Sequence, residues 1–391
     1  MATTSNNIPQ GYKATALGII PQEWEVKRLG EICTYFKSGE GITSKDISEN
    51  GQYPVYGGNG LRGYTDKKYT HDGAYILIGR QGALCGNINY VTGKCYISEH
   101  AIAVQTKGDL SWLRYKLDFW NLNRYSESSA QPGLSVEKLV RYKLTVPPLA
   151  EQRKIAEVLG VWDEAIEKQA RLIEKLALRK RALMQRLLSA KLRLPGFSDP
   201  WQNVKFCELF TKSIKTAEPL KKYEVLSVTK EGIVAQKSYF NKDIASEDTS
   251  KYIVVERGDL AMSGLNFWMG SCHILTNFDE GIISPAYKVF KVTEHNNIDF
   301  IRDFVRSSMF LQALQGCSVI GASIVRRNLD KEMLYEWTFK IPSLKEQTAI
   351  AEVLTAADRE IELAKEKLER LRRQKRGLMQ QLLTGKKRIK Y

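Results

Sequence analysis

The chain has 391 residues, which exceeds the size of a single hydrophobic core and suits two or more domains. Its net charge of +15 favours a polyanionic partner, whereas the 6 scattered cysteines and 4 histidines argue against a zinc site or a disulfide framework. No apolar run approaches the roughly 18 residues needed to span a bilayer, and no signal-peptide pattern is recognisable, so we expect a cytoplasmic protein without a membrane partner.

The first segment, residues 1–146, has the pattern of a globular α+β domain. Short runs of β-branched and aromatic residues bounded by Gly, Asn and Asp predict strands. These runs are YPVYGGNGLRGY, GAYILIGRQGALCGNINYV and KCYISEHAIAV. A short amphipathic helix is expected around SWLRYKLDFW.

Within this segment, the residues from Gly58 to Gly63 match the GxGxxG fingerprint of dinucleotide-binding proteins. The residues that follow, YTDKKYTHDGAY, lack a helical pattern, although a bound pyrophosphate would need a helix N-terminus there. We therefore interpret the segment as a glycine-rich turn or recognition loop, in which Asn59, Arg62 and Tyr64 are the reaching side chains, and we expect no cofactor.

Residues 147–195 predict a long helix that begins at Pro147-Pro148 and stops at Pro195-Gly196. One apolar face recurs in alternating steps of four and three residues, which is typical of a coiled coil. The residues of this seam are Ile155, Leu159, Trp162, Ile166, Gln169, Ile173, Leu176, Lys180, Leu183 and Leu187.

Residues 196–341 predict a second α+β domain. Its opening phrase, WQNVKFCEL from Trp201, is similar to WEVKRLGEI from Trp24, but the interiors of the two domains diverge. The predicted strands lie in YEVLSVTKEGIVAQ, GDLAMSGLNFWMGSCHIL and GIISPAYKVFKV, and helical structure is expected in FIRDFVRSSMFLQAL.

Residues 342–391 repeat the first long helix at a constant offset, because EQRKIAEVL begins at Glu151 and EQTAIAEVL at Glu346, and 346 − 151 = 195. About 23 of the 47 paired positions from Pro147 and Pro342 onward are identical. Ser343 and Glu346 have capping-box spacing, and Gly385 is the expected stop. The second seam is Ile350, Leu354, Ala357, Ile361, Ala364, Leu368, Leu371, Lys375, Leu378 and Leu382.

Two matching seams are buried most simply against each other, and a duplication related by a pseudo-two-fold axis makes the helices antiparallel. Lys180 and Lys375 interrupt the seams at equivalent places, where we expect them to set register. The predicted fold is therefore α+β, with two globular domains joined by two long antiparallel coiled-coil helices. In the alternative, each helix packs only on its own domain.

Catalytic motifs are missing from the sequence. There is no GxxxxGK[ST], no HExxH, no GxSxG and no Asn/Asp-Pro-Pro-aromatic phrase, and the carboxylates show no metal-ligand spacing. We therefore expect a binding protein rather than an enzyme, with no metal and no cofactor of its own.

The basic excess lies mostly on the repeats: residues 151–193 have 11 Lys and Arg against 6 Asp and Glu, and residues 346–391 have 12 against 7. Charge alone thus does not locate a reading surface. Side chains that can contact base edges occur in glycine-rich turns of both domains. They are Arg62, Arg80, Gln81, Asn87 and His100 in the first domain, beside Asn59 and Tyr64, and Asn266, Arg326, Arg327 and Asn328 in the second. The expected phosphate contacts are Lys67, Lys68, Lys212, Lys215, Lys221 and Lys222. For each of these residues, a solvated surface role is the alternative.

The order of variable domain, helix, second variable domain and second helix resembles the specificity subunit of type I restriction-modification systems. The resemblance is carried by Pro147, Leu149, Glu151-Gln152 and Ile155 and by their counterparts Pro342, Leu344, Glu346-Gln347 and Ile350. One departure is Pro132-Gly133-Leu134-Ser135 in the first domain, which faces Arg327-Asn328-Leu329-Asp330 in the second. Loop roles should therefore not be transferred between the two halves.

The resemblance implies that each variable domain is a target-recognition domain that reads one half of a split site in double-stranded DNA, while the helices fix the gap. It also implies two modification (methyltransferase) subunits that dock along the helices and bring S-adenosylmethionine. Restriction subunits, which hydrolyse ATP and cleave DNA, would join the full complex.

Two other functions stay open at the level of sequence. The chain could be a DNA or RNA methyltransferase or nuclease with diverged motifs, in which case the purified chain would be active alone. It could also be a dimeric coiled-coil scaffold that binds only protein, in which case its behaviour toward duplex DNA would not depend on salt.

Overall fold

The computed structural model describes residues 8–82, 84–126, 133–218, 222–240, 249–320 and 327–389. The chain forms two compact units. Unit 1 comprises Met1–Ala170 and Glu366–Tyr391, and unit 2 comprises Arg171–Lys365. Each unit therefore combines one globular region with the first part of one long helix and the last part of the other.

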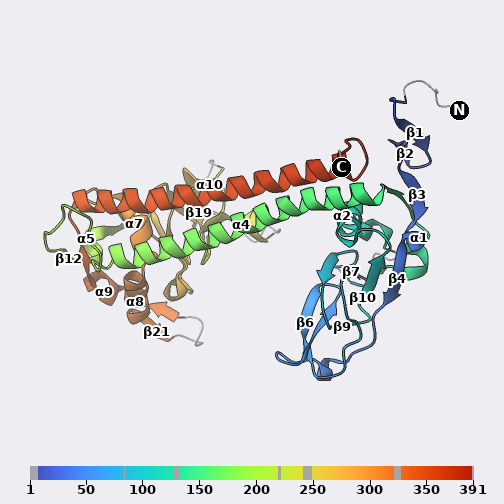
Figure 1. Ribbon diagram of the computed structural model, residues 1–391. Helices are drawn as coiled ribbons and strands as arrows, with labels where there is room; N and C mark the ends of the chain where they lie inside the picture. The colour runs from blue at the N-terminus through green and yellow to red at the C-terminus, as the bar shows by residue number, and fades with distance from the viewer. Residues whose placement is uncertain are drawn as a thin grey trace. The chain divides into compact units, whose positions relative to one another are not determined.

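The long helices are α4 (Leu149–Leu187) and α10 (Leu344–Leu382), drawn in green and red in Figure 1. Each has 39 residues. None of the predicted seam residues is classed as exposed in either helix, which confirms the heptad pattern. None of the helices formed by the described residues has an apolar stretch that could cross a bilayer.

The two helices end in the same way. Ala190 and Gly385, which are equivalent in the repeat, have φ angles of 57° and 74°. Behind them, Leu192 N donates to Arg186 O and Lys387 N to Gln381 O, a hydrogen-bond pattern that closes a helix C-terminus. The expected stop of the first helix at Pro195 was therefore too late, because the left-handed residue Ala190 ends the helix first.

In unit 1 the start of α4 and the end of α10 run antiparallel. Lys375 Nζ donates to Asp163 Oδ1, and further along, Arg388 Nε donates to Glu151 Oε1 at 2.7 Å. Residue numbers thus fall along α10 as they rise along α4. Ile155 and Leu159 pack in the same hydrophobic core as the end of α10.

Unit 2 has the complementary pair of helix ends, also antiparallel. Lys180 Nζ donates to both carboxylate oxygens of Asp358 at 2.6 Å, and Arg193 Nε donates to Glu346 Oε1 at 2.6 Å. The core contains Leu187 from the end of α4, together with Ile350 and Leu354 from the start of α10.

The globular region of unit 1 is built on a four-stranded antiparallel sheet of order β4-β10-β7-β8, to which α2 is packed. Strands β5, β6 and β9 form a separate three-stranded sheet of order β6-β5-β9, and β11 pairs with β3. The strands are β1 (Tyr12–Thr15), β2 (Gly18–Pro21), β3 (Glu25–Arg28), β4 (Cys33–Ser38), β5 (Tyr53–Gly57), β6 (Gly60–Thr65), β7 (Tyr75–Gly79), β8 (Ile88–Val91), β9 (Tyr96–Ile97), β10 (Ala101–Thr106) and β11 (Lys143–Val146). The helices are α1 (Leu29–Ile32), α2 (Leu110–Trp120) and α3 (Val136–Leu139), with 3-10 turns η1 (Ser44–Asp46) and η2 (Leu122–Tyr125).

Unit 2 repeats this plan with a four-stranded sheet of order β13-β20-β17-β18, and β12 pairs with β23. The helical structure predicted in FIRDFVRSSMFLQAL is formed by α7 (Ile298–Phe304) and α8 (Ser308–Gly316). The strands are β12 (Gln202–Lys205), β13 (Phe210–Lys212), β14 (Leu226–Val228), β15 (Ile233–Ala235), β16 (Ile253–Glu256), β17 (Leu260–Met262), β18 (Cys272–Ile274), β19 (Glu280–Ile283), β20 (Lys288–Val292), β21 (Ser318–Ile320), β22 (Arg327–Leu329) and β23 (Thr338–Ile341). The helices are α5 (Phe206–Leu209), α6 (Gln236–Phe240), α7 (Ile298–Phe304), α8 (Ser308–Gly316) and α9 (Lys331–Glu336), with the 3-10 turn η3 (Phe267–Met269).

The repeated Glu of the EQ phrase connects each helix start to the globular region. Glu151 is fully buried, and its carboxylate accepts from Trp24 Nε1 at 2.9 Å as well as from Arg388. In unit 2 the same bonds join Glu346 to Trp201 and Arg193. Glu346 was expected to form a reciprocal capping box with Ser343, but only the bond from Glu346 N to Ser343 Oγ forms, because the carboxylate is engaged elsewhere.

The repeated Gln holds the N-terminus of a short helix in each globular region, α2 in unit 1 and α7 in unit 2. Gln152 Oε1 accepts from Asp109 N, and Gln152 Nε2 donates to Pro147 O, both at 2.9 Å. Asp109 is the residue that caps α2, through Trp112 N. Gln347 makes the same two bonds to Asn297 N and Pro342 O. The EQ repeat thus fixes each globular region to its helix.

Candidate nucleic-acid interface

Three loops of unit 1 meet at one end of its main sheet. The turn between β5 and β6 contains Gly58, and a Cβ atom there would lie 2.9 Å from His100 O and 3.2 Å from Gly79 Cα. Arg80 N, in the loop after β7, donates to His100 O at 2.9 Å. Only glycine permits so close an approach, so the turn brings Asn59 beside Arg80 and His100. The GxGxxG phrase thus forms a β-hairpin, as the interpretation of a turn predicted.

Most of the predicted reading residues of unit 1 lie on these loops and reach the surface. Asn59, Arg62, Gln81 and Asn87 are exposed, whereas Arg80 and His100 are half-buried. Gln81 Oε1 lies 3.2 Å from His100 Nδ1, so these two side chains form one polar group. Amide, imidazole and guanidinium groups on neighbouring loops are suited to contacts with base edges.

Three predicted residues of unit 1 do not join this cluster. Tyr64 is at the far end of β6 from the Asn59 turn, and Lys67 and Lys68 follow that strand end. Lys67 Nζ is paired with Asp46 Oδ2 at 2.8 Å. The sequence places these residues close to Asn59 along the chain, but an extended strand carries them away from it.

Unit 2 has a loop at the matching place, between β17 and β18. Asn266 is exposed on this loop, and Trp268 lies in its 3-10 turn. The guanidinium carbon of Arg327 is 4.2 Å from the centre of the Trp268 ring, which is a cation–π contact. Arg327 Nε is buried and has no hydrogen-bond partner among the described residues, and Asn328 is exposed next to it.

Trp268 was not among the residues predicted from the sequence, although a tryptophan within a glycine-bounded loop was a usable signal. The sequence did predict that the loop segments 132–135 and 327–330, which occupy equivalent positions in the two halves, have different roles. In unit 1, Leu134 N donates to Arg80 O at 2.9 Å and Gly133 forms a bridge with Gln81, while in unit 2 the matching segment provides Arg327. Each unit therefore presents different chemistry from the same scaffold.

The predicted phosphate contacts of unit 2 divide into two kinds. Lys212 and Lys222 are exposed, whereas Lys215 Nζ is paired with Glu256 Oε1 at 2.6 Å. Lys221 and Arg326 lie outside the described residues.

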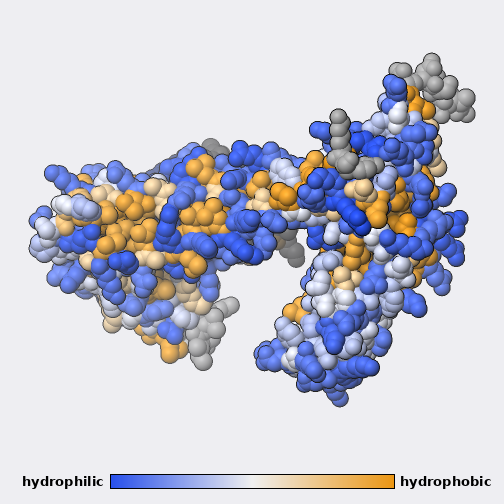
Figure 2. Space-filling model, viewed as in Figure 1, coloured by the Kyte–Doolittle hydropathy of each residue, from blue (hydrophilic) through white to orange (hydrophobic). Residues whose placement is uncertain are grey.

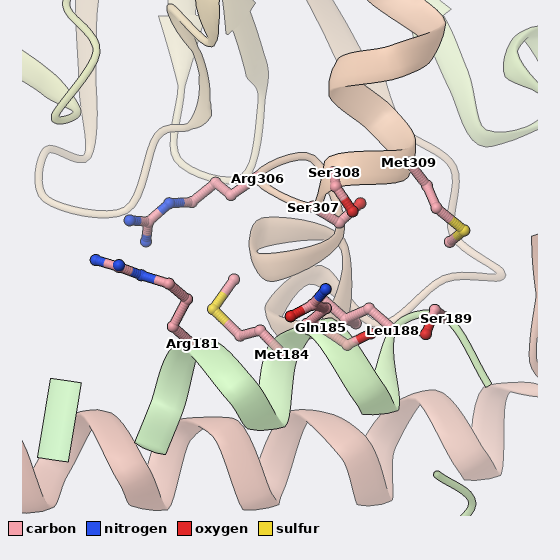
Figure 3. Close-up of a pocket in the computed structure, with 9 residues that line it drawn as sticks. All are labelled: Arg181, Met184, Gln185, Leu188, Ser189, Arg306, Ser307, Ser308 and Met309. Atoms are coloured by element: carbon pink, nitrogen blue, oxygen red, sulfur yellow. Dashed lines mark hydrogen bonds between the residues drawn. The ribbon is translucent and has the colours of Figure 1, made fainter. Parts of the chain in front are cut away.

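A pocket in unit 2 lies between the end of α4 and the start of α8 (Figure 3). Met184, Leu188 and Met309 provide apolar lining, and Arg181 and Arg306 point toward one another from the two sides. Two neighbouring guanidinium groups favour an anionic group of a partner. No cluster of three or more His, Cys, Asp or Glu side chains suited to a metal ion occurs in the part of the chain that the structure describes.

The comparison with known protein families decides the identity. The model for the type I restriction modification DNA specificity domain matches twice, over residues 21–177 and 198–373. The chain belongs to this family. The resemblance read from the EQ repeats is thereby confirmed, and the chain is a type I restriction-modification specificity protein rather than an enzyme with diverged motifs.

Curated type I specificity subunits are similar to this specificity protein in part or throughout. The EcoprrI specificity subunit of Escherichia coli is 42% identical over 160 residues, which is 39% of this chain and 39% of that protein. The MjaVIII specificity subunit of Methanocaldococcus jannaschii is 25% identical over 408 residues, covering 95% of this chain and 94% of its own length.

Solved structures show the same fold. The S subunit of a type I restriction-modification system from M. genitalium has 15% identity and a TM-score of 0.54, covering 92% of this specificity protein and 96% of that chain. A chain from a study of complex assembly and conformational transition of the type I R-M system has 15% identity and a TM-score of 0.58, covering 94% and 99%. The predicted fold class, α+β with two globular domains and two long helices, is confirmed.

Proposed function

We propose that the globular regions of unit 1 and unit 2 each read one half of a bipartite site in double-stranded DNA. One observation carries this proposal. The main sheets of the two units have the same strand order, whereas the loops at the end of each sheet carry different side chains. Arg80, Gln81 and Asn59 are the readers in unit 1, and Asn266, Arg327 and Asn328 are the readers in unit 2. Because the two sets differ, the two half-sites differ, and the whole site is not a palindrome.

The two long helices set the number of base pairs between the half-sites. Each has 39 residues, which corresponds to about 60 Å at about 1.5 Å per residue. A rigid helix whose start is fixed to a globular region suits this task, and the EQ bonds provide this fixation in each unit. The domain boundaries that follow are residues 1–146 and 196–341 for recognition and 147–195 and 342–391 for spacing.

Two methyltransferase subunits dock on the helix pair, and restriction subunits join them in the full complex. The helices of unit 2 expose Leu172, Leu178 and Leu363, at 44%, 59% and 48%, and Figure 2 shows apolar side chains on this part of the surface. Solvated apolar residues on a long helix favour a protein partner. The pocket between Arg181 and Arg306 is a basic anchor point for an acidic group of the same partner.

The test is a binding selection from a randomised duplex library, using the chain with the partner that it retains on purification. The expected result is two short conserved blocks separated by a constant run of unselected bases. A single conserved block, or salt-sensitive binding without any base preference, would contradict the proposal that both globular regions read DNA bases.

A further inference from the structure

A pocket on unit 2 is surrounded by four lysines: Lys212, Lys251, Lys288 and Lys331. Its floor is apolar and aromatic, and includes Tyr287, Tyr335 and Leu334. The lysines come from four separate places in the chain: the end of β13, the residues before β16, the start of β20 and the start of α9. The cluster therefore exists only in the folded unit.

These lysines are not matched by acidic side chains. Among the described residues, none of the four forms an ion pair, and the pKa of Lys288 is lowered by burial and by repulsion from Lys331 and Lys212. The nearby carboxylate of Asp330 accepts from Met333 N at 2.9 Å to cap α9. Positive charges that repel one another over a concave surface are stabilised by a bound anion.

Other lysines of unit 2 show the usual arrangement. Lys215 and Lys291 share Glu256, with Nζ to carboxylate distances of 2.6 and 3.1 Å. Both ammonium groups thus face one carboxylate, and their hydrogen bonds lower the pKa of Glu256. The same unit thus contains a matched set of paired and unpaired lysines, and only the unpaired set surrounds a pocket.

The pocket adjoins the candidate reading loops. Lys288 is opposite Met262, the last residue of β17, and the loop with Asn266 and Trp268 begins directly after that residue. A Cβ atom on Gly264 of this loop would overlap Ala286 O, so the loop touches the segment that leads into Lys288. Leu329 lines the pocket directly after Asn328. A duplex held against these loops would bring its backbone close to the lysines.

The position in unit 1 that corresponds to Lys288 is occupied by Ile102. Ile102 pairs with Ile78 in the main sheet of unit 1, and Lys288 pairs with Met262 at the equivalent place in unit 2. Ile78 and Met262 each belong to the hydrophobic core that includes the long helices in their own unit. Ile102 is fully buried. A lysine at this position is thus a property of unit 2 and not a requirement of the fold.

We propose that the four-lysine pocket of unit 2 is a phosphate-binding site, which holds a backbone phosphate of the duplex beside the bases read by the Asn266 and Arg327 loops. The phosphate chemistry follows from the pocket, whereas its source in DNA rests on the proposed function. The site positions unit 2 on its half-site without selecting bases, because phosphates carry no sequence information.

The test compares two double variants that each lose two positive charges from unit 2. Lys288→Gln with Lys331→Gln removes half of the pocket lysines, and the control, Lys205→Gln with Lys291→Gln, removes two lysines that are paired with Glu336 and Glu256. Binding to a selected duplex is measured at several salt concentrations, and binding of inorganic tripolyphosphate is measured by calorimetry. Thermal unfolding shows that each variant is folded.

The pocket variant is expected to bind every duplex about tenfold more weakly, with a salt slope smaller by about one, because one phosphate contact is lost, and with unchanged selected bases. It also loses binding of tripolyphosphate, while the control variant retains binding of both the duplex and tripolyphosphate. If tripolyphosphate binding is lost but duplex binding is not, the pocket holds a free phosphate compound and its assignment to DNA is wrong. If the two variants behave alike in both assays, the phosphate site itself is refuted, whatever the library selection shows.

Discussion

Lys180 Nζ lies 2.6 Å from both carboxylate oxygens of Asp358, and it ties the end of α4 to the start of α10. The equivalent pair, Lys375 with Asp163, occurs in unit 1, at positions shifted by 375 − 180 = 195 and 358 − 163 = 195. The two lysines that interrupt the apolar seams therefore each meet an aspartate of the antiparallel partner. Such a pairing favours one register and one direction, because any slip leaves a charge on an apolar seam.

Replacing Lys180 with Met should lower the free energy of unfolding. Lys180 is only 8% exposed and also lies 3.6 Å from the fully buried Asp303, so its loss leaves two carboxylates short of positive charge. We expect a cost of about 1–3 kcal/mol, measured as a fall in the thermal unfolding midpoint. The control is Lys168→Met, whose pair with Glu164 is solvent-exposed and should change stability by less than about 0.5 kcal/mol. Equal effects of the two substitutions would contradict the role of Lys180.

Glu151→Gln should destabilise the attachment of the unit 1 globular region to α4. The carboxylate accepts from both Trp24 and Arg388, whereas an amide has one oxygen and would turn its NH2 group toward one of these donors. A loss of about 2 kcal/mol is expected in thermal unfolding, and Glu346→Gln should behave alike in unit 2. Glu157→Gln, with a side chain that is 63% exposed, is the matched control and should have almost no effect. The prediction fails if Glu157→Gln is as damaging.

Lys116 should make stability depend on pH in the alkaline range. Burial lowers the pKa of Lys116 to about 8 from its ordinary 10.5, while its ammonium donates to Thr145 Oγ1 and Leu383 O at 2.9 and 2.6 Å. Between these two values, the unfolded chain binds the proton and the folded chain does not, so stability rises with pH in this window. The free energy of unfolding of the wild type, relative to that of Lys116→Met, should therefore rise from pH 7 to 10.5 by a total of about 3 kcal/mol at most. The control is Lys143→Met, at an exposed position, which should keep the pH dependence of the wild type. The expectation is refuted if the difference in free energy of unfolding between the wild type and Lys116→Met does not change with pH.

Arg327→Ala should weaken recognition of one half-site and leave the other unchanged. A side chain that contacts a base edge contributes about 1–3 kcal/mol, so binding should become roughly 5- to 150-fold weaker and one base of that half should become unselected. Arg80→Ala should have the corresponding effect on the other half. Arg257→Ala removes an arginine of unit 2 that is paired with Asp279, and it serves as the control. If Arg327→Ala lowers affinity equally for all sequences, Arg327 contacts phosphate instead.

Deleting one heptad from both helices, residues 173–179 and 368–374, should shorten the preferred gap. Lys180, Asp358, Lys375 and Asp163 lie outside the deleted segments, so both ion pairs can form again in the shorter coil. The loss of about 10 Å of helix corresponds to about three base pairs, and both half-sequences should stay the same in a library selection. Deletion of 173–179 alone breaks the register and should lower the unfolding midpoint. An unchanged gap in the double deletion would show that the helices do not measure the DNA.

Much of the fold is local in origin and could be predicted from the sequence. The seams from Ile155 to Leu187 and from Ile350 to Leu382 repeat every seven residues, and a helix brings such residues to one face without help from distant parts of the chain. The strands in both globular regions follow in the same way from runs of β-branched and aromatic residues between glycine turns. The sequence also showed that both domains open on a similar phrase with a tryptophan, and in the structure Trp24 and Trp201 make equivalent hydrogen bonds to Glu151 and Glu346.

Side-chain partners were decided only by the tertiary structure. Spacing predicted that Glu346 would return to the backbone near Ser343, but Arg193 and Trp201, brought in by other segments, bind its carboxylate more strongly. The same is true of the lysines: nothing along the chain distinguishes Lys215, which has Glu256 beside it, from Lys288, which has only other lysines. Periodicity determines which face of an element is buried, whereas the partner of a charged or polar side chain depends on which loops and strands the fold brings to the same place.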